Sequence, residues 1–404
     1  MSKDLKIFTN NVEAEAVEQI NLLLEQEPFK DCKVRIMPDV HAGKGCVIGF
    51  TADLGDKVIP NIVGVDIGCG MLCVELGKID LDLEKLDEVI NEFIPSGMNV
   101  HKKEKYNFDK LEELCCYKVL KNKDNYLNRS MGTLGGGNHF IEIDEDDEGN
   151  KYLVIHTGSR NLGKQVAELY QNEAIRQHSY FNEIQAEKQL MINMLQLQNR
   201  EQEIEQKLKE IENKYNGKTK MPRDLCYLEG EIREAYLHDM KICQKYASLN
   251  RKYIADEILS RYFGPGLEGF VELHSFETIH NYISFEDNIV RKGAISAKKD
   301  ERVLIPINMR DGSIIAVGKG NEDWNCSAPH GAGRIMSRTK AKQTFQLDEF
   351  VKSMKDVYST SVLEETIDEA PFVYKPMQEI IDNIHDTVEI EKIIRPIYNF
   401  KAKN

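Results

Sequence analysis

The chain has 404 residues, of which 41% are hydrophobic and 30% charged, and its formal net charge is −14. This composition is typical of a globular protein with an ample core and excludes the collagenous and disordered classes. No apolar run approaches the ~20 residues that a membrane-spanning helix needs, and the start lacks the apolar core of a signal peptide. We therefore expect no membrane contact and a cytoplasmic location.

The nine cysteines also favour a reducing compartment. Their number is odd and their spacing irregular, which argues against a disulfide framework. A cysteine with a function would then be a metal ligand or a nucleophile. The acidic balance argues against wholesale electrostatic binding of nucleic acid, although it leaves room for a local basic site.

In chain order, the first predicted element is a helix over 11–26, whose apolar residues recur on one face. Short strands punctuated by glycine follow it, and residues 80–127 read as mixed and mainly helical. A strand over 152–158 then runs into a helix that begins near Asn161. The three early strands are predicted at 33–37, 46–54 and 71–77.

Residues 180–262 differ in character from the rest. Apolar residues spaced by three and four predict one helix that ends at Gly217, and a second helix follows over about 223–262. We interpret this range as a helical hairpin arm inserted between two core parts, 1–179 and 263–404. An equal alternative is that both helices pack on the body. The row of apolar residues on the first helix, called the seam, could equally contact a partner chain. The seam consists of Leu190, Met194, Leu197, Ile204, Leu208, Ile211 and Tyr215.

From 285 to about 339 the pattern returns to strands and glycine-rich turns, and 341–404 is predicted to be helical with a short strand at 397–400. The predicted fold class is therefore α+β, with a β-rich core carrying glycine loops, surrounding helices and the inserted arm.

Several short segments, called islands below, contain both glycine and residue types that can bind a metal ion. Asp66 and Cys69 stand three apart, and a carboxylate with a thiolate suits Zn²⁺, Mn²⁺ or Co²⁺ better than Mg²⁺. Alone, Cys69 could equally be a small buried apolar residue. Three glycines precede Asn138 and His139, where the alternatives are a flexible loop and a hydrogen-bonded core histidine.

Two further islands contain histidine. His156 closes a strand, and the Ser159-Arg160 turn after it could bind phosphate at a helix N-terminus or simply cap that helix. His280 is uninformative by itself.

A histidine in a bare glycine loop, His330, lies near the start of a locally basic stretch. Residues 328–342 contain Arg334, Arg338, two lysines and no acid. Arginine matches phosphate oxygens, although a solvated basic helix face is the usual alternative.

Jointly the islands could hold two metal ions. Three histidines, one aspartate and one cysteine suffice if the cysteine bridges, and such a pair is a standard clamp for in-line attack at phosphorus. His330 would remain free as a nucleophile that forms a phosphoramidate.

The ordered set of islands resembles the RtcB family of RNA ligases, which join 2′,3′-cyclic-phosphate or 3′-phosphate ends to 5′-hydroxyl ends. The similarity runs from Pro38 to Lys401. It rests on MPDVHAGKG (37–45), VIPNIVGVDIGCGM (58–71), GGGNHFIE (135–142), IHTGSR (155–160), HN (280–281), RKGA (291–294) and PHGAGR (329–334).

The resemblance implies dependence on two Mn²⁺ ions and GTP. Asp66 and His139 would hold one ion, His156 and His280 the other, and Cys69 would bridge them. His330 would carry GMP, with Asp39 near the metals as a general base. The nucleotide contacts would be Asn138 and Arg160 near phosphate, Glu142 at the guanine edge, Asn308 and Ser313 at two serine positions of the family, and Tyr374 and Lys401 on the guanine.

The implied reaction has three stages. The cyclic phosphate is opened to a 3′-phosphate, His330 takes GMP from GTP and passes it to that phosphate, and the 5′-hydroxyl displaces GMP. The chain departs from the family at Val290, at 295–296, in the 306–312 loop, at Asn161 and at Ala402. These departures resemble a divergent bacterial branch linked to repair of cleaved RNA.

Two alternatives remain at this point. A binuclear metal phosphoesterase would open 2′,3′-cyclic phosphates with the same five ligands and without ligation. A non-catalytic RNA-binding or partner protein would act through the 180–262 arm. A protein partner, bound through that arm or resembling a release factor, is a further hypothesis.

Overall fold

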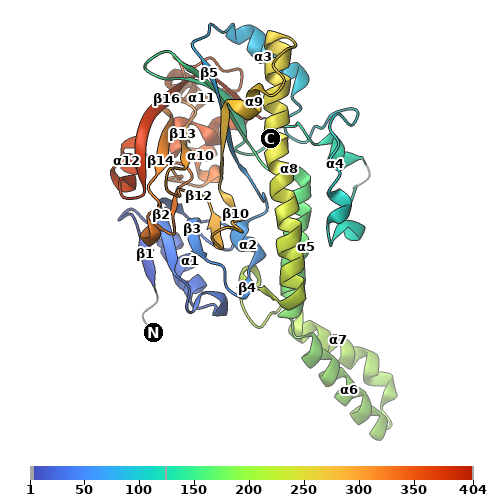
Figure 1. Cartoon of the computed structure of the whole chain (residues 1–404). Coiled ribbons are helices and arrows are strands. Elements are labelled where there is room, and N and C mark those ends of the chain that lie inside the picture. Colours follow the sequence, from blue (N-terminus) through green and yellow to red (C-terminus); the bar gives the residue numbers. More distant parts are fainter. Residues whose placement is uncertain (1–3, 123–124, 403–404) are drawn as a thin grey trace.

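The computed structural model describes residues 4–122 and 125–402. Figure 1 shows a body built from strands and helices, the long helix α8 (Gly230–Phe263) running along one side of it, and a helical pair projecting at the bottom. The α+β class expected from the sequence is the class observed.

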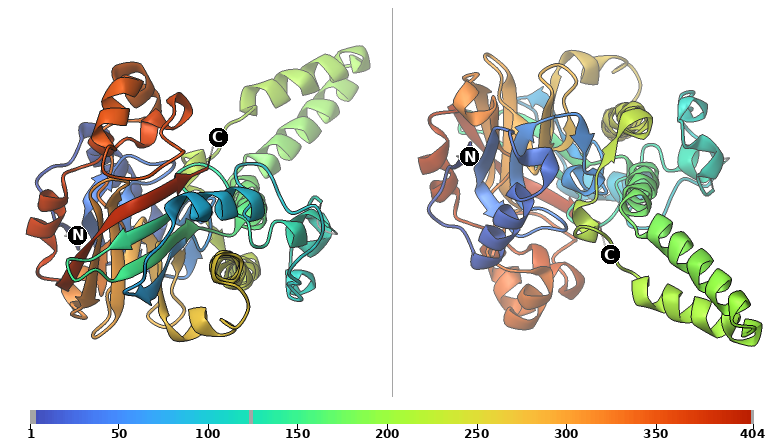
Figure 2. Two further views of the ribbon diagram at one scale, coloured as in Figure 1. Left: turned by 90° about the horizontal axis from the view of Figure 1, so that it is seen from above. Right: turned by 90° about the horizontal axis from the view of Figure 1, so that it is seen from below.

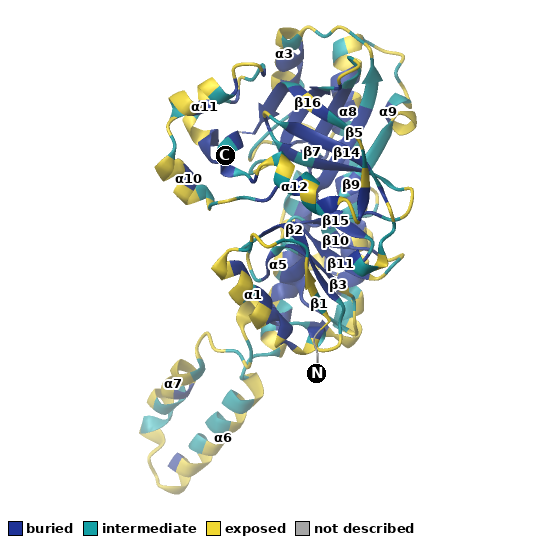
Figure 3. Cartoon of the chain, turned by 90° about the vertical axis from the view of Figure 1, so that its left-hand side faces the viewer, coloured by how far each residue is buried: buried dark blue, intermediate teal, exposed yellow. Residues whose placement is uncertain are grey.

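The larger sheet forms the centre of the body. Its strands follow the order β13-β14-β16-β6-β7-β5-β9, and neighbouring strands are antiparallel throughout. Both faces are covered, which explains why its strands are largely buried (Figure 3). The strands are β5 (Gly70–Gly77), β6 (Phe140–Glu145), β7 (Lys151–Thr157), β9 (Ser275–Ile279), β13 (Arg302–Asn308), β14 (Gly312–Gly318) and β16 (Val388–Lys401).

Strand β16 corrects the prediction for the C-terminal segment. A short strand was expected at 397–400, but the strand covers Val388–Lys401 and joins β14 to β6. Pro396 and several charged residues interrupt its alternation of apolar side chains, and register shifts at Ile315/Ala316 and Pro396/Tyr398 absorb the irregularity.

A second sheet lies beside the first, in the order β1-β2-β3-β11-β10. Only the β1–β2 pair in this sheet is parallel within the described residues. A short pair, β12 (Ala294–Ser296) and β15 (Ser327–Pro329), leads directly to His330. The remaining strands are β1 (Leu5–Ile7), β2 (Val34–His41), β3 (Ile48–Asp53), β4 (Lys57–Val58), β8 (Leu228–Glu229), β10 (Asn281–Ile283) and β11 (Ile289–Lys292).

The hairpin expected over 180–262 takes a different form. Helices α6 (Phe181–Leu197) and α7 (Ile204–Tyr215) pair with each other and stand clear of the body in every view (Figures 1 and 2). Helix α8 instead packs on the body against α5 (Arg160–Gln177), α3 (Leu83–Phe93) and β7. The division into two core parts and one arm stays a prediction.

The continuous seam predicted for the arm is also broken. The helix stops after Leu197, and Asn199 adopts a left-handed φ of 53° at the turn between α6 and α7, a conformation that asparagine tolerates well. As a result Leu190 and Leu197 are 61% and 85% exposed, whereas Leu195 and Ile211 are buried between the two helices.

The other helices are short. They are α1 (Ala14–Leu24), α2 (Pro60–Val63), α4 (Tyr126–Arg129), α9 (Phe270–Leu273), α10 (Arg338–Thr344), α11 (Leu347–Ser353) and α12 (Met377–Ile384). Among the described helices, none combines the length and the apolar character needed to cross a bilayer. All nine cysteines lie in the described ranges as free thiols.

Candidate active site

The five predicted metal ligands converge at one end of the central sheet. Strand β5 pairs Gly70 with Thr157 of β7 and Ile279 of β9, so the neighbouring residues meet there. The Cys69 Sγ atom lies 3.2 Å from His156 Nε2 and 3.5 Å from His139 Nε2. The ligand atoms form two overlapping sets that share Cys69, namely Asp66, Cys69 and His139, and Cys69, His156 and His280.

The histidine tautomers suit metal binding. His139 Nδ1 donates to the Leu134 carbonyl at 2.8 Å, and His156 Nδ1 donates to the Asn138 carbonyl at 3.2 Å. A proton on Nδ1 leaves the Nε2 lone pair directed at the cluster. Burial, reinforced by neighbouring histidines, also lowers the pKa of His156 and His280 well below the usual value, which favours the neutral, metal-binding form.

An orphaned polar atom provides a further test of fit. His280 Nδ1 is buried and has no hydrogen-bond partner within 4–122 and 125–402, and leaving such a group unpaired is costly. Burial first, and the Asp66 charge second, raise the pKa of the Cys69 thiol well above its usual value, an effect that bound cations would offset. The residues present therefore fit a pair of transition-metal ions.

Asp66 is held where Gly158 leaves room for it. Its Oδ2 lies 3.0 Å from His139 Nε2, and its Oδ1 accepts a hydrogen bond from the Ser159 amide at 3.2 Å. A Cβ atom on residue 158 would lie 2.1 Å from Asp66 Oδ1. Glycine at 158 is thus a steric requirement of the cluster.

Helix α8 supports the cluster from behind. Arg251 is fully buried, and its Nη1 donates to the carbonyls of Gly68 at 2.9 Å and Thr157 at 2.7 Å. These two residues precede or follow the ligands Cys69 and His156 directly. Sequence reasoning missed Arg251 because its segment was assigned to the arm and carries no motif.

His330 lies beside the cluster. Its ring centroid is 4.9 Å from that of His280, and its Nδ1 lies 2.6 Å from Asp39 Oδ2, which also accepts the His330 amide at 3.2 Å. The loop approaches β2 closely, since a Cβ atom on Gly333 would lie 2.3 Å from the Asp39 carbonyl oxygen. The imidazole is thus fixed through Nδ1, and its side chain retains 20% exposure.

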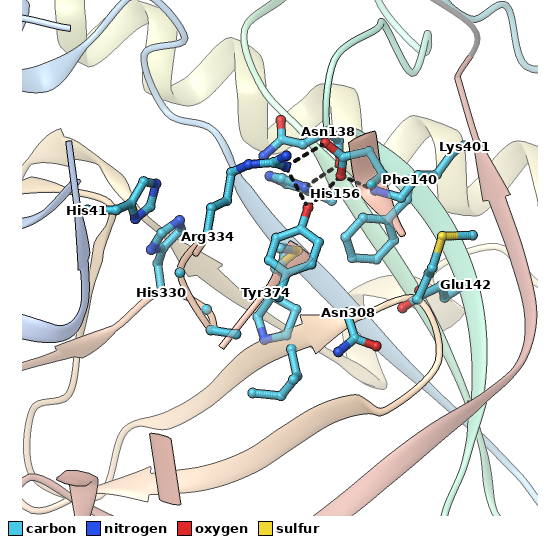
Figure 4. A pocket seen from close by; sticks show the side chains of 18 of the residues that line it. His41, Asn138, Phe140, Glu142, His156, Asn308, His330, Arg334, Tyr374 and Lys401 are labelled. Carbon is cyan, nitrogen blue, oxygen red and sulfur yellow. Dashed lines mark hydrogen bonds and ion pairs between the residues drawn. The ribbon is translucent and has the colours of Figure 1, made fainter. Parts of the chain in front are cut away.

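A pocket with an empty volume of about 720 Å³ opens next to His330 (Figure 4). It is lined by both sheets and by the C-terminal segment. Of the predicted nucleotide contacts it brings together Asn138, Glu142, Asn308, His330, Tyr374 and Lys401.

Two predicted nucleotide contacts lie elsewhere. Arg160 is not among the described residues that line the pocket, and its guanidinium donates to Thr133 Oγ1 and the Gly97 carbonyl at 3.0 Å each. Ser313 is fully buried on β14 and is not among the described lining residues. Their roles as nucleotide contacts therefore stay predictions.

The pocket contains an acidic residue that the sequence reasoning missed. Glu369 accepts hydrogen bonds from Lys401 Nζ and Tyr374 Oη, both at 2.7 Å (Figure 4). Burial alone would raise the pKa of Glu369, but the charges of Lys401 and Arg338 outweigh it and lower the value to about 2. Its stretch of sequence was predicted to be helical and carries no motif.

The basic stretch 328–342 is therefore not a free positive patch. Arg334 Nη1 contacts Glu369 at 3.3 Å, and Arg338 Nη1 contacts Glu369 at 2.5 Å and Asp368 at 2.7 Å. The neutralising carboxylates come from η7 (Glu364–Glu369), about thirty residues away in sequence.

Arg291 and Lys292, the first two residues of the RKGA motif, are buried structural residues. Arg291 pairs with Asp287 at 2.8 Å and donates to Ser327. Lys292 Nζ donates to the carbonyls of Lys44 at 2.6 Å and Asn61 at 3.0 Å. Both side chains are engaged inside the body rather than offered to a ligand.

Glu142 is a buried carboxyl that faces the pocket. It accepts a hydrogen bond from Asn399 at 2.5 Å, and burial is the main cause that raises its pKa to about 7. A buried carboxylate with spare lone pairs is an effective acceptor for the N–H groups of a ligand.

The chain was compared with known proteins. A family model described as tRNA-splicing ligase RtcB matches residues 23–402. The chain is 30% identical over 439 residues to the RNA-splicing ligase RtcB of Escherichia coli K12, covering 98% of this chain and 97% of that protein. It is 27% identical over 459 residues to the tRNA-splicing ligase RtcB of Nanoarchaeum equitans, covering 91% and 87% respectively.

Proposed function

The chain belongs to the RtcB family, and from that premise we propose that it is an RNA ligase. It joins 2′,3′-cyclic-phosphate or 3′-phosphate ends to 5′-hydroxyl ends, uses GTP and two Mn²⁺ ions, and proceeds through a covalent His330–GMP intermediate. The observation that carries this proposal is the position of His330, which is fixed by Asp39 beside a cluster of five metal-ligand side chains.

Asp66, Cys69, His139, His156 and His280 are the proposed ligands of the two ions. Bound there, the ions would stabilise negative charge on the non-bridging phosphate oxygens. The mixture of thiolate, imidazole and carboxylate suits a transition metal better than Mg²⁺.

His330 is the proposed nucleophile. The contact of its Nδ1 with Asp39 leaves the Nε2 lone pair free, so Nε2 attacks the α-phosphorus of GTP, a P–N bond forms and pyrophosphate leaves. Asp39 holds the ring and stabilises the positive charge that develops on it, as an aspartate does in a catalytic triad. We propose this orienting role, and the general-base role expected from sequence stays a prediction.

The pocket beside His330 is the proposed GTP site. Glu142 accepts the N–H groups at the guanine edge, Lys401 donates to the base, and Tyr374 packs on it; Asn138 and Asn308 contact the rest of the nucleotide. The network of Glu369 with Lys401 and Tyr374 holds these two side chains in place before GTP binds. For Arg160 and Ser313 we propose supporting roles behind the site.

The RNA ends are the proposed macromolecular substrate, and repair of cleaved RNA is the proposed setting. This preference rests on the departures from the family pattern, among which Val290 is buried in β11 and the 306–312 loop borders the pocket. A cytoplasmic location, proposed from the reduced thiols, agrees with that setting.

The decisive experiment is labelling with GTP. Incubation with Mn²⁺ and α-labelled GTP under anaerobic conditions should yield acid-labile label that pyrophosphate removes. His330→Ala should abolish the label, and His385→Ala, which alters an exposed histidine, should retain it. Equal label in wild type and His330→Ala would refute the proposal. Cyclic-phosphate cleavage that needs neither GTP nor His330 would instead support a binuclear metal phosphoesterase.

A further inference from the structure

We propose that Cys115, His238 and Asp239 form a separate site for a divalent transition metal, with Zn²⁺ as the best fit. Cys115 lies in the loop between η2 (Leu111–Glu113) and η3 (Tyr117–Val119), whereas His238 and Asp239 are consecutive on α8. Their donor atoms lie within 4.8 Å of one another. None of the three belongs to the candidate active site.

The distances match tetrahedral coordination. Zinc binds sulfur at about 2.3 Å and nitrogen or oxygen at about 2.0–2.2 Å, so two tetrahedral ligands stand roughly 3.6 Å apart for S and N and roughly 3.4 Å apart for N and O. The Cys115 Sγ atom is 3.7 Å from His238 Nδ1, which in turn is 3.2 Å from Asp239 Oδ1. Two of the three donor separations therefore match those that a zinc ion imposes, and the third is no longer than 4.8 Å.

The chemistry of the trio favours a cation over a network of hydrogen bonds. His238 Nδ1 faces both the thiol and the carboxylate, and that nitrogen offers either one proton or one lone pair. A metal ion would satisfy all three groups at once. Thiolate, imidazole and carboxylate together select Zn²⁺ over Mg²⁺ or Ca²⁺, which prefer oxygen.

Asp239 is preorganised for this role. Its side chain is fully buried, Oδ2 accepts hydrogen bonds from Tyr170 Oη at 2.8 Å and the Cys116 amide at 3.0 Å, and Oδ1 accepts the Cys115 amide at 2.7 Å. These bonds fix the carboxylate and leave a second lone pair on Oδ1 for a metal, as outer ligands do in metal sites. Cys115 and His238 are exposed, so solvent can supply the fourth ligand and ions can enter.

A metal here would join the 111–119 segment to α8. The same helix continues to Asn250, which accepts the Gly132 amide at 2.8 Å, and to Arg251 behind the candidate active site. Residues 239 and 250 are about 17 Å apart along a helix. The site would thus brace the helix that supports the active-site loops without touching substrate.

The test follows alkylation of Cys115 by peptide mass spectrometry in the full-length protein. Zn²⁺ should slow modification of Cys115 by about tenfold or more because a metal-bound thiolate is protected, whereas Mg²⁺ should not. Cys326 is partly exposed and belongs to no such cluster among the described residues, so it should react at an unchanged rate as the internal control. The protection should disappear in His238→Ala, a variant at an exposed position.

Metal content gives the second readout. After dialysis against Zn²⁺ and removal of excess, wild type should retain one equivalent more than Cys115→Ser or His238→Ala. Equal zinc content in wild type and both variants, or a Cys115 alkylation rate that Zn²⁺ does not change, would overturn the proposal. Neither readout depends on ligase activity, so this inference and the proposed function can fail separately.

Discussion

At the scale of single residues, the partners of a buried polar group decide what that group can do. Asp39, Glu142 and Glu369 are all carboxyls with almost no exposed surface, yet each has a different partner. Asp39 holds an imidazole, Glu369 is ionised among cations, and Glu142 has one amide partner and a raised pKa. Their proposed tasks in orientation, preorganisation and base recognition follow from those partners.

Replacement of Asp39 by asparagine should impair guanylylation without unfolding the protein. The amide preserves the shape but removes the charge that stabilises the His330 imidazolium, and a similar change in a catalytic triad costs about 10⁴-fold. We expect the rate of label transfer from GTP to fall by about 100-fold or more while GTP affinity changes little. Asp382→Asn on the surface is the control, and an unaltered rate in Asp39→Asn would exclude the orienting role.

Cys69→Ser should reduce metal binding. Serine is a poor replacement for a thiolate that belongs to both sets of proposed metal ligands. Loss of this shared ligand leaves two incomplete metal sites. Wild type dialysed against Mn²⁺ should retain two equivalents and Cys69→Ser fewer than one, as measured by elemental analysis. Cys32→Ser, at a half-buried thiol outside the cluster, should match wild type. Retention of two equivalents by Cys69→Ser would contradict a bridging cysteine.

Glu142→Gln should change the pH dependence of stability. Because the folded-state pKa of Glu142 is raised to about 7, its ionisation opposes folding; that cost is absent below about pH 4.5 and complete above about pH 8. The variant should therefore be more stable than wild type by about 3 kcal/mol at pH 8.5 and similar at pH 4.5. Urea unfolding at both pH values measures this, and a pH-independent difference would argue against the raised pKa.

The same variant should bind GTP more weakly. A glutamine cannot accept two N–H donors as a carboxylate does, and charge-assisted hydrogen bonds are the stronger ones. We expect the affinity for GTP to fall by about tenfold or more while the affinity for ATP, which lacks those donors, stays the same. Equilibrium binding of both nucleotides gives the comparison.

At the scale of elements, α8 supports function from outside the active site. Its residues from Tyr236 to Leu259 are mostly buried, and Asn250 and Arg251 hold the loops that carry Asp66, Cys69 and His156. A helix is a suitable support because its side chains project at fixed intervals from a rigid axis. The α6–α7 pair, in contrast, contacts little beyond itself.

Arg251→Met should destabilise the protein and weaken metal binding together. Removal of the guanidinium leaves the Gly68 and Thr157 carbonyls unpaired and deprives Glu277 of its 2.9 Å partner. Loss of one partner of a buried charge pair costs about 3–5 kcal/mol. Thermal unfolding and Mn²⁺ content should both decrease, whereas Arg261→Met, at a half-exposed position on the same helix, should change neither. A decrease in stability with unaltered Mn²⁺ content would confine Arg251 to a structural role.

At the scale of the whole molecule, the projecting pair is separable from the body. Its two ends meet at the bridge between Ser179 and Thr219, and every predicted ligand and pocket residue lies outside 181–215. The body has its own cores around both sheets. The pair is therefore a feature that can be removed to test what the body does alone.

Replacement of residues 181–216 by a short glycine-serine linker should leave guanylylation within about twofold of wild type. Close ends make the loop inexpensive to shorten, and the site is built from other elements. The measurement is the same GTP labelling, with circular dichroism to verify folding. Abolished labelling in a folded deletion variant would show that the pair contributes to the active site.

The sequence by itself determined the local identities: the fold class, the ligand residue types, the order of the motifs and the histidine in its glycine loop. These depend on composition, alternation and spacing, which are properties of short segments. Together with the resemblance to the RtcB family, they predicted that Asp66, Cys69, His139, His156 and His280 act together, and the strands of the central sheet do bring them to one place.

Only the tertiary structure decided which residues, distant in sequence, neutralise each other's charge, which are buried, and which line the pocket. It paired Arg334 and Arg338 with carboxylates of η7, buried Arg291 and Lys292, placed Arg160 and Ser313 outside the pocket lining, and laid α8 on the body rather than in an arm. The physical reason is that burial and electrostatic pairing depend on neighbours in space. The sequence around a charged residue does not identify the distant partner with which that residue will be buried.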